Sequence, residues 1–193
     1  MENAGRCDYL DHAMADLDAS TPMASLLARF PGAKRALFAR YHIGGCSSCA
    51  YRDDETLAEV ATRNEIDVSE VIEHILQSHT VDAAMLIAAK DVKELVESGA
   101  EIVFLDTRTR EEHEAVAITG SEFMTQERQQ ELFGSAKEDT TIILYDHTGG
   151  RVLDTCAWFQ GHGLKGTRGV IGGIDGWSKE VDKSVPRYRL EMD

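Results

Sequence analysis

Residues 146–151, Asp-His-Thr-Gly-Gly-Arg, combine the residue types of an anion-binding loop. The apolar run before them, residues 141–145, predicts a buried strand, and the apolar positions of residues 152–160 predict a helix. In such a strand–loop–helix unit the loop amides and the helix N-terminus point at one spot and attract negative charge. We therefore expect the carboxylate of Asp146 to occupy that spot, bonded to the loop amides and paired with Arg151.

An alternative role for Asp146 is that of a general base acting with His147. A base of this kind needs a substrate or a further polar partner, and nothing else in the sequence supplies one. The sequence therefore favours a carboxylate that fills the loop over a carboxylate that takes up protons. The candidate residues of this loop are Asp146, His147, Thr148, Gly149, Gly150 and Arg151.

A second group of reactive side chains lies at residues 42–49, His-Ile-Gly-Gly-Cys-Ser-Ser-Cys. Two Cys separated by two residues, Cys46 and Cys49, can form a redox disulfide, carry a persulfide beside a resolving thiol, or supply half of a metal site. The two glycines before them let the backbone turn tightly. We assign thiol chemistry to Cys46 and Cys49, with two ordinary small residues in a turn as the alternative.

A metal ion at Cys46 and Cys49 would need further ligands. His74 and His79 follow in the sequence, but the spacing of the whole set is not that of a standard zinc finger. On its expected helix His74 points away from the apolar side, so we expect it to be exposed. His79 faces the apolar side only if that helix continues past Ser78. The sequence leaves open a zinc ion or an iron–sulfur cluster at the Cys pair, including one shared between two chains.

The other two of the four cysteines carry no assigned chemistry. Cys156 lies in the expected helix after the loop, beside apolar and aromatic residues, and is expected to be a small buried hydrophobe. Cys7 lies in an acidic leader, and no role is assigned to it.

The first 80 residues predict a loose acidic leader, residues 1–20, and a small all-helical domain, residues 21–80. We expect Thr21 to be the N-cap of the first helix, with Pro22 as its first residue. Asp67 and Glu70 are expected to form a capping-box-like pair at the start of the fourth helix. The helices are expected at residues 22–30, 33–41, 55–63 and 68–76.

Beyond a boundary near residues 78–82, the pattern changes to alternating strands and helices, which defines a second domain at residues 81–193. This alternation predicts an α/β fold with a parallel sheet and helices on both faces. The strands are expected at residues 85–88, 102–106, 141–145 and 169–171, with a further one at 122–124. The helices are expected at residues 91–97, 110–115, 126–133, 151–160 and 175–180.

Residues 82–184 resemble the rhodanese-like sulfurtransferases. The family's active-site loop runs Cys, two variable residues, Gly, one variable residue, Arg, and Gly149 and Arg151 fall in register with it. Asp146 stands where the family has its nucleophilic Cys, and a carboxylate cannot carry a persulfide. The resemblance therefore implies a rhodanese-like fold whose sulfurtransferase site is inactive. The loop is also shorter than that of the related dual-specificity phosphatases, which argues against phosphatase activity.

Further matches to this family lie on both sides of the loop. Residues 102–108 resemble its strand ending in Asp-x-Arg, and residues 170–177 resemble its closing Gly-Gly-Ile-x-x-Trp signature. Two positions depart from the family, since Ala117 replaces a His and Thr119 replaces a Pro. The residues that the resemblance assigns to support of the site are Asp106, Arg108, Gly172, Gly173 and Trp177.

The Cys pair has a resemblance of its own. Residues 30–57 are similar to the small redox-disulfide domain associated with hybrid cluster proteins, and a similar segment opens some iron–sulfur repair proteins. The resemblance implies a short helical domain with a reactive Cys pair, which agrees with the helical pattern of residues 21–80.

Net charge, the length of the apolar runs and the N-terminal residues exclude several classes of protein. A formal net charge of −14 argues against nucleic acid or an anionic membrane as partner, because both require a basic surface. The longest apolar run, residues 83–89, is far too short to span a bilayer. Residues 1–18 lack the basic start and apolar core of a signal peptide. These features predict a cytoplasmic protein, in which cysteines are more often thiols, redox pairs or ligands than structural disulfides.

Together the sequence predicts a sulfur- or redox-handling protein with thiol chemistry at Cys46 and Cys49 and an inactive rhodanese-like docking domain. Its expected partner is a protein of sulfur trafficking or iron–sulfur assembly. The alternative is a non-catalytic binding or regulatory module whose Cys pair holds a structural zinc ion or cluster. An active thiosulfate sulfurtransferase at the 146–151 loop is the least favoured hypothesis.

Overall fold

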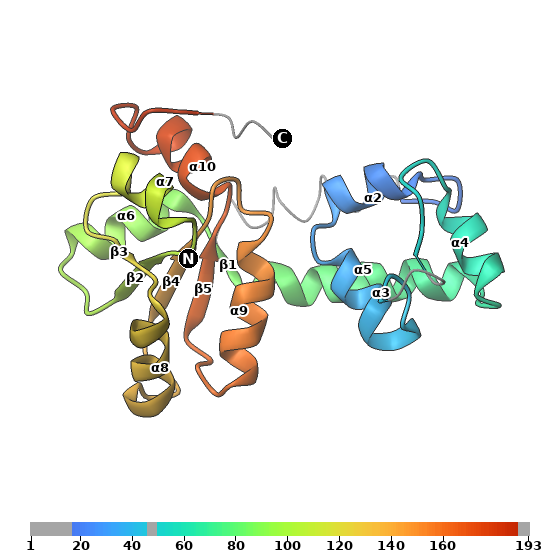
Figure 1. The fold of residues 1–193 in the computed structure, drawn as a ribbon, viewed down its shortest axis with the longest axis horizontal. Coiled ribbons are helices and arrows are strands. Elements are labelled where there is room, and N and C mark those ends of the chain that lie inside the picture. The colour runs from blue at the N-terminus through green and yellow to red at the C-terminus, as the bar shows by residue number, and fades with distance from the viewer. Residues whose placement is uncertain (1–16, 46–49, 189–193) are drawn as a thin grey trace. The chain divides into compact units, whose positions relative to one another are not determined.

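The computed structural model describes residues 17–45 and 50–188, which form two compact units that divide after Ala84. The N-terminal unit is helical, and the C-terminal unit is built on a β-sheet (Figure 1). The expected boundary, near residues 78–82, falls inside a helix that continues to Ala84. The two units are described separately below.

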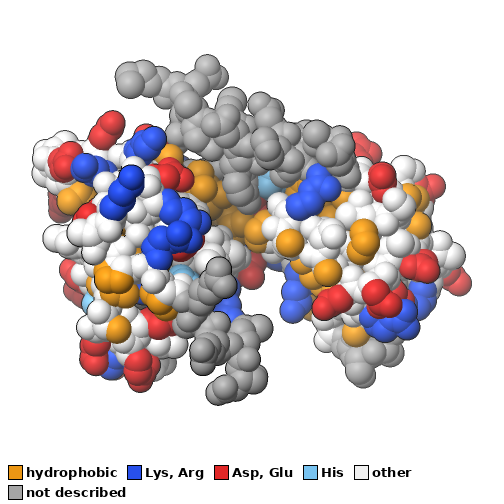
Figure 2. Space-filling view, turned by 90° about the horizontal axis from the view of Figure 1, so that it is seen from above, with side chains coloured by type: hydrophobic (Ala, Val, Ile, Leu, Met, Phe, Trp, Pro, Cys, Tyr) orange, Lys and Arg blue, Asp and Glu red, His pale blue; other side chains and the backbone are white. Residues whose placement is uncertain are grey.

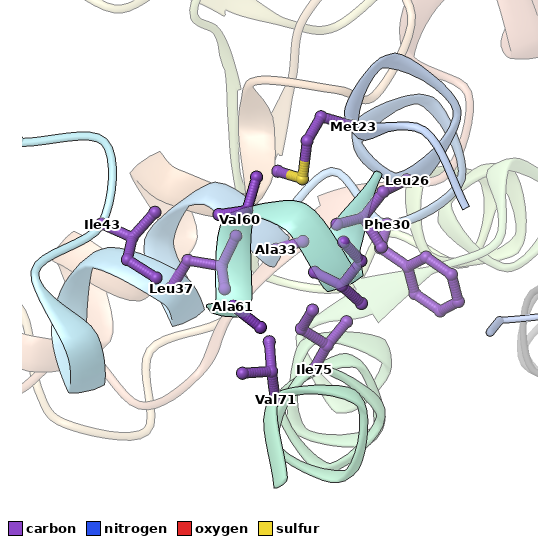
Figure 3. Close-up of a cluster of buried hydrophobic side chains, with 11 residues drawn as sticks. Met23, Leu26, Phe30, Ala33, Leu37, Ile43, Val60, Ala61, Val71 and Ile75 are labelled. Atoms are coloured by element: carbon purple, nitrogen blue, oxygen red, sulfur yellow. The ribbon is translucent and has the colours of Figure 1, made fainter. Parts of the chain in front are cut away.

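The described part of the N-terminal unit packs four helices around one apolar core. Figure 3 shows side chains from these helices, and from the loop after the second, gathered in that core. Phe30, Leu37 and Ile75 are almost completely buried there, as amphipathic helices of this length require for stability. The helices are α2 (Met23–Arg29), α3 (Ala33–Tyr41), α4 (Leu57–Arg63) and α5 (Val68–Ala84).

The start of α2 differs from the expectation. Thr21 is not the N-cap, because Pro22 holds that position in an extended conformation and without a side-chain cap. This stretch pairs instead with the segment before α4: the amide of Met23 donates to the carbonyl of Glu55 at 2.8 Å. The amide of Leu57 donates back to the carbonyl of Thr21 at 2.9 Å. Backbone pairing thus fixes Thr21 and Pro22 before the helix begins.

The starts of α4 and α5 use different caps. α4 begins after Thr56, whose hydroxyl accepts from the amide of Glu59 while the Glu59 carboxylate accepts from the amide of Thr56, a complete capping box. At α5 the carboxylate of Asp67 accepts from the amide of Ser69 at 2.8 Å. The backbone of Glu70 bonds to the same carboxylate, as expected, but the Glu70 carboxylate forms an ion pair with Arg40 of α3 at 2.7 Å, so one half of the predicted capping-box-like pair is confirmed.

Two histidines of α5, His74 and His79, pack against neighbouring side chains and are partly or fully buried. Nε2 of His74 lies 3.1 Å from the carbonyl oxygen of Ala36, and its ring meets the edge of Tyr41 at 5.6 Å. The expectation that His74 is exposed is therefore wrong, because α3 packs along this side of α5. α5 does continue past residue 78, and His79 is buried with its ring 5.0 Å from that of Phe30.

The described part of the C-terminal unit is built on a five-stranded parallel sheet with the order β1-β5-β4-β2-β3. Asp106 at the end of β2 lies opposite Tyr145 at the end of β4. Because the carboxyl ends of parallel strands meet at one edge, the segments that follow these two residues are neighbours. The strands are β1 (Leu86–Ile87), β2 (Val103–Asp106), β3 (Glu122–Phe123), β4 (Ile142–Tyr145) and β5 (Thr167–Val170).

Helices cover both faces of this sheet (Figure 1). α6 and α10 pack on one face, where Trp177 lies 6.1 Å from Phe104, and α9 packs on β4 and β5 from the other. All four residues of β4 are buried, as expected of a central parallel strand covered on both sides. The helices are α6 (Ala89–Glu97), α7 (Arg110–Ala115), α8 (Gln126–Ser135), α9 (Val152–Gly161) and α10 (Gly173–Glu180).

The predicted fold class is confirmed: a parallel α/β sheet with helices on both faces follows an all-helical N-terminal part. The strand expected at residues 122–124 is present as β3, and β5 begins two residues before its expected start at 169.

Candidate functional site

The loop after β4 folds around the carboxylate of its first residue, Asp146. Its Oδ1 accepts a hydrogen bond from the amide of Gly149, and its Oδ2 accepts from the amides of Arg151 (2.7 Å) and Val152 (2.9 Å). Asp146 is only 6% exposed, so water competes little for these bonds. Charge-assisted bonds to amides at a helix start are strong. The carboxylate thus occupies the place at which the loop amides converge.

The side chain of Arg151 does not join this arrangement. Its guanidinium is exposed, and within the described residues no ion pair links it to Asp146. The expected ion pair is therefore wrong, and the backbone amide of Arg151 makes the contact instead. Arg151 is the last residue before α9, so its amide faces the carboxylate while its side chain extends into solvent.

The turn after β5 closes against this loop from the side of α10. Gly172 and Gly173 have φ angles of 74° and 56°, which favour glycine, and α10 starts at the second of them. The amide of Ile174 then donates to the carbonyl of Asp146 at 2.9 Å. A Cβ at Gly173 would lie 2.4 Å from that same carbonyl oxygen. Only glycine at this position lets the two segments approach so closely.

A buried polar network lies beside the loop, centred on Asp106. Its carboxylate accepts hydrogen bonds from Nε and Nη2 of Arg108 (2.9 and 2.5 Å) and from the hydroxyl of Tyr145 (2.8 Å). Nδ1 of His113 lies 2.9 Å from the same carboxylate. Burial alone would raise the pKa of Asp106, but hydrogen bonds from Arg108 and His113 outweigh it and hold that pKa below its ordinary value.

Arg108 and Tyr145, two other members of this network, have strongly shifted pKa values. Burial would lower the pKa of Arg108, but its bonds to Asp106 and Tyr188 raise it, so the guanidinium stays charged. Burial, together with the charge on Asp106, raises the pKa of Tyr145, so its hydroxyl remains a donor. Nη2 of Arg108 also donates to the carbonyl of Val116 at 2.6 Å. The network ties the segment after β2 to the end of β4.

The C-terminal unit matches a known protein family. The model of the rhodanese-like domain matches residues 88–180. Residues 88–180 form a rhodanese-like domain. The five-stranded parallel sheet described above is the rhodanese-like fold, so the domain is related to proteins of the sulfurtransferase fold.

The solved structures to which the chain is similar are distant in sequence. One is a protein of unknown function and possible tyrosine phosphatase from Rhodopseudomonas palustris, 23% identical over 53% of this chain and 83% of its own, with a TM-score of 0.43. Another is the rhodanese-like domain of a protein from Anabaena sp., 17% identical over 56% and 89%, with a TM-score of 0.45. A third, from Lactobacillus plantarum, is 20% identical over 59% and 96%, with a TM-score of 0.46. No curated protein matches the chain.

The rhodanese-like domain brings together the residues that the sequence singled out in this half of the chain. Asp106 and Arg108 form the buried network, Gly172 and Gly173 lie against the loop, and Trp177 of α10 is buried near Phe104 of β2. Within the loop, His147 is half-buried, whereas Thr148 and Gly150 are exposed.

The Cys pair, Cys46 and Cys49, lies outside the described residues, so the assignment of thiol chemistry to it stays a prediction. At its described flanks His42 ends α3 with a φ of 59°. A Cβ at Gly45 would lie 2.2 Å from the ring of Phe38, so glycine is required there unless that ring moves. Over the described ranges, no group of three or more His, Cys, Asp or Glu side chains is arranged to hold a metal ion.

Other sequence-based expectations can be compared with the structure directly. Cys156 is fully buried against Gly169 of β5, which confirms its interpretation as a small core residue. Cys7, like the Cys pair, lies outside the described residues. In the described part of the chain, no helix combines the length and hydropathy needed to cross a membrane.

Sequence reasoning missed two tyrosines of the site. Tyr145 was expected only as a strand residue, although a hydroxyl at the end of an otherwise apolar strand is a usable signal. Tyr188 lies eighty positions from Arg108, and its hydroxyl accepts from Nη1 of Arg108 at 2.5 Å. No local pattern predicts a contact over such a separation.

Proposed function

We propose that this chain handles sulfur or electrons through Cys46 and Cys49, and that its rhodanese-like domain is a docking platform with an inactive sulfurtransferase loop. The observation that supports the second part is the carboxylate of Asp146, which accepts hydrogen bonds from three backbone amides. The first part is supported by the sequence, which pairs two Cys at redox spacing with glycines before them.

Physical chemistry argues against sulfur transfer at the loop. A carboxylate oxygen does not form a persulfide, so Asp146 cannot carry sulfane sulfur. An anionic sulfur donor that approached the loop would meet the charge of Asp146 and amides that already have an acceptor. If residue 146 were a cysteine, the same amides would stabilise its thiolate.

In the proposed reaction the thiolate of Cys46 or Cys49 attacks the sulfane sulfur of a donor such as thiosulfate. A sulfur–sulfur bond forms on the cysteine, the donor's sulfur–sulfur bond breaks, and sulfite leaves with the bonding pair. The second thiol then attacks the cysteine sulfur of the persulfide and releases hydrosulfide. The two cysteines lose two electrons to the sulfane sulfur and end as a disulfide, which an external thiol reductant returns to the starting state.

The proposed setting follows from the same features. The partner would be a protein of sulfur trafficking or iron–sulfur assembly that binds the rhodanese-like domain and exchanges sulfur or electrons with the Cys pair. The proposed compartment is the cytoplasm, where thiols are kept reduced.

The experiment that tests this proposal is intact-mass spectrometry of the reduced chain after brief incubation with thiosulfate or polysulfide, followed by peptide mapping. We expect added sulfur on Cys46 or Cys49, and none after both are replaced by Ser. Cys7→Ser is the matched control and should leave the uptake unchanged. Reactive thiols without added sulfur would restrict the proposal to disulfide redox chemistry, and unreactive thiols would contradict it.

The second candidate function is a non-catalytic module in which Cys46 and Cys49 hold a structural zinc ion or iron–sulfur cluster, and it rests on the same Cys spacing. Metal analysis of protein purified without oxygen separates the two, because a stoichiometric metal would mask the thiols and require their deprotonation. Zinc or iron at a fixed ratio, lost in Cys46→Ser, would favour this second function.

The proposal that only residue 146 disarms the loop has its own test. In a chain with Cys46→Ser and Cys49→Ser, the further change Asp146→Cys should create sulfur uptake from thiosulfate at position 146, mapped by mass spectrometry. The reason is that the amides of Gly149, Arg151 and Val152 would then stabilise a thiolate. Failure would mean that the departures at Ala117 and Thr119, or the loop geometry, have also removed the activity.

A further inference from the structure

The chain folds back onto the site after the last helix of the rhodanese-like domain. Residues 181–188, here called the C-terminal strap, lie beyond the stretch matched by the family, which ends at residue 180. Val185 is the strap's buried anchor, and its carbonyl accepts from the hydroxyl of Ser178 at 2.6 Å. Nε of Arg187 then pairs with Asp175 at 2.6 Å. Tyr188 follows directly and lies at the rim of the 146–151 loop, against His147.

Tyr188 contacts three separate segments at once. Its ring stacks on that of His147 with the centroids 4.3 Å apart and the planes 4° from parallel. Nε2 of His147 lies 3.1 Å from the carbonyl oxygen of Tyr188, which can only accept, so this nitrogen donates. The phenol oxygen accepts from Nη1 of Arg108 at 2.5 Å and donates to Glu112 at 2.6 Å.

The placement of these contacts links the strap to the loop. His147 directly follows Asp146, whose carboxylate holds the loop amides. Arg108 belongs to the buried network around Asp106, so Tyr188 joins that network to the outer side of the loop. Tyr188 therefore contacts both the loop and Nη1 of Arg108. The other guanidinium nitrogens of Arg108 bind Asp106 and Val116.

The strap itself is held by few buried groups. Of its residues Val185 alone is buried, and Tyr188 is half-buried. Val181 and Tyr188 are partly buried and pack against the core, and the strap's ion pair with Asp175 lies at the surface, where such pairs contribute little. Segments with few buried apolar contacts open at lower free energy than the sheet beneath them. The strap can therefore release while β4 and β2 stay folded.

We propose that the C-terminal strap is a latch, with Tyr188 as the side chain that holds the 146–151 loop closed. Release of Tyr188 frees His147 and exposes Nη1 of Arg108, and this uncovers a polar face of the domain beside the loop. The latch deepens the proposed docking function, because it would regulate access to the same loop. Its test measures backbone amides and not sulfur, so the latch and the proposed function can fail separately.

The test is amide hydrogen exchange on the full chain, in the wild type, Tyr188→Ala and Tyr188→Phe. Tyr188→Ala removes the ring stack and both phenol bonds, so we expect exchange at Gly149, Arg151 and Val152 to become about tenfold faster or more. Tyr188→Phe keeps the ring and loses only the phenol bonds, and should give about threefold. Low urea should not change these rates, because the opening is local.

Two references make the result specific to the latch. The amides of β4 (Ile142–Tyr145) should exchange alike in all variants. Arg187→Gln, which removes an exposed ion pair of the same strap, should leave the loop amides as in the wild type. Unchanged loop amides in Tyr188→Ala would overturn the latch. If Tyr188→Ala speeds exchange throughout the sheet, Tyr188→Phe decides: faster exchange confined to the loop supports the latch, and no change overturns it.

Discussion

Two aspartates lie at the carboxyl ends of the neighbouring strands β2 and β4, and their negative charges are stabilised in different ways. Asp106 ends β2 and is fully buried, and its charge is balanced by the guanidinium of Arg108 and a ring of side-chain donors. Asp146 follows β4, is almost as buried, and is balanced by backbone amides, with no side-chain cation paired to it among residues 17–45 and 50–188. The same residue type therefore serves as the centre of a side-chain network in one place and as the filler of a loop in the other.

The difference indicates what each carboxylate is for. Asp106 holds together elements distant in the sequence, and its loss would leave a buried guanidinium without its partner. Asp146 holds only its own loop, in the place where a chemically active side chain could be stabilised by the same amides. We infer that Asp106 is structural and that residue 146 is the position on which the chemistry of this loop depends.

The largest effect is expected on the Asp106 side of this comparison. Arg108→Ala leaves a buried carboxylate without its cation, so the free energy of unfolding should fall by about 3–5 kcal/mol. Urea denaturation followed by circular dichroism measures it. Lys90→Ala, which changes an exposed residue of α6, is the control and should cost no more than about 0.5 kcal/mol. A loss for Arg108→Ala as small as that of the control would contradict the network.

A smaller loss of stability is expected for Asp146→Ala. This change leaves three amides of the loop without their acceptor, which costs about 1–3 kcal/mol, at the lower end where water reaches the exposed positions of the loop. The same urea experiment measures it. A loss equal to that of Arg108→Ala would mean that the two aspartates do not differ as described.

The pH dependence of stability tests the Asp106 side of the comparison. The folded pKa of Asp106 lies below its ordinary value of 3.8, so its contribution is fully present above the unfolded pKa and is lost as the pH falls through 3.8 and then through the folded pKa. The difference in unfolding free energy between the wild type and Asp106→Asn should therefore be constant from about pH 5 to 7 and shrink below about pH 4. A difference that grows on acidification would show that the sign is wrong.

The smallest effect is expected at Arg151. Its guanidinium is exposed and no ion pair links it to Asp146, so Arg151→Ala should change the free energy of unfolding by less than about 0.5 kcal/mol. A larger loss would mean that, in the dissolved protein, the guanidinium of Arg151 binds the carboxylate of Asp146 in addition to the backbone amide.

The sequence predicted the parts of this molecule that depend on local pattern. β4 is an uninterrupted apolar run, and α7 begins with the acidic residues typical of a first turn, so both were placed correctly. Gly172 and Gly173 were singled out by the resemblance of residues 170–177 to the closing signature of the rhodanese-like family, and in the structure a Cβ at Gly173 would lie 2.4 Å from the carbonyl oxygen of Asp146.

Features that depend on distant partners were not predicted. Thr21 looks like an N-cap, yet its backbone pairs with a segment more than thirty positions later. His74 looks exposed on its own helix and is covered by α3. Tyr188 has no periodic neighbours, and its role depends wholly on the fold that brings Arg108 and His147 to it. Such contacts belong to the tertiary structure and leave no signal in the spacing of residues.

Peptide-mapped sulfur uptake by Asp146→Ala, compared with the wild type, separates chemistry at the Cys pair from chemistry at the loop. The proposed function places sulfur chemistry at Cys46 and Cys49 and none at the 146–151 loop. It predicts that both proteins acquire the same amount of sulfur, on the Cys pair, after incubation with thiosulfate or polysulfide. Loss of uptake in Asp146→Ala, with the chain still folded, would contradict it and return the chemistry to the loop.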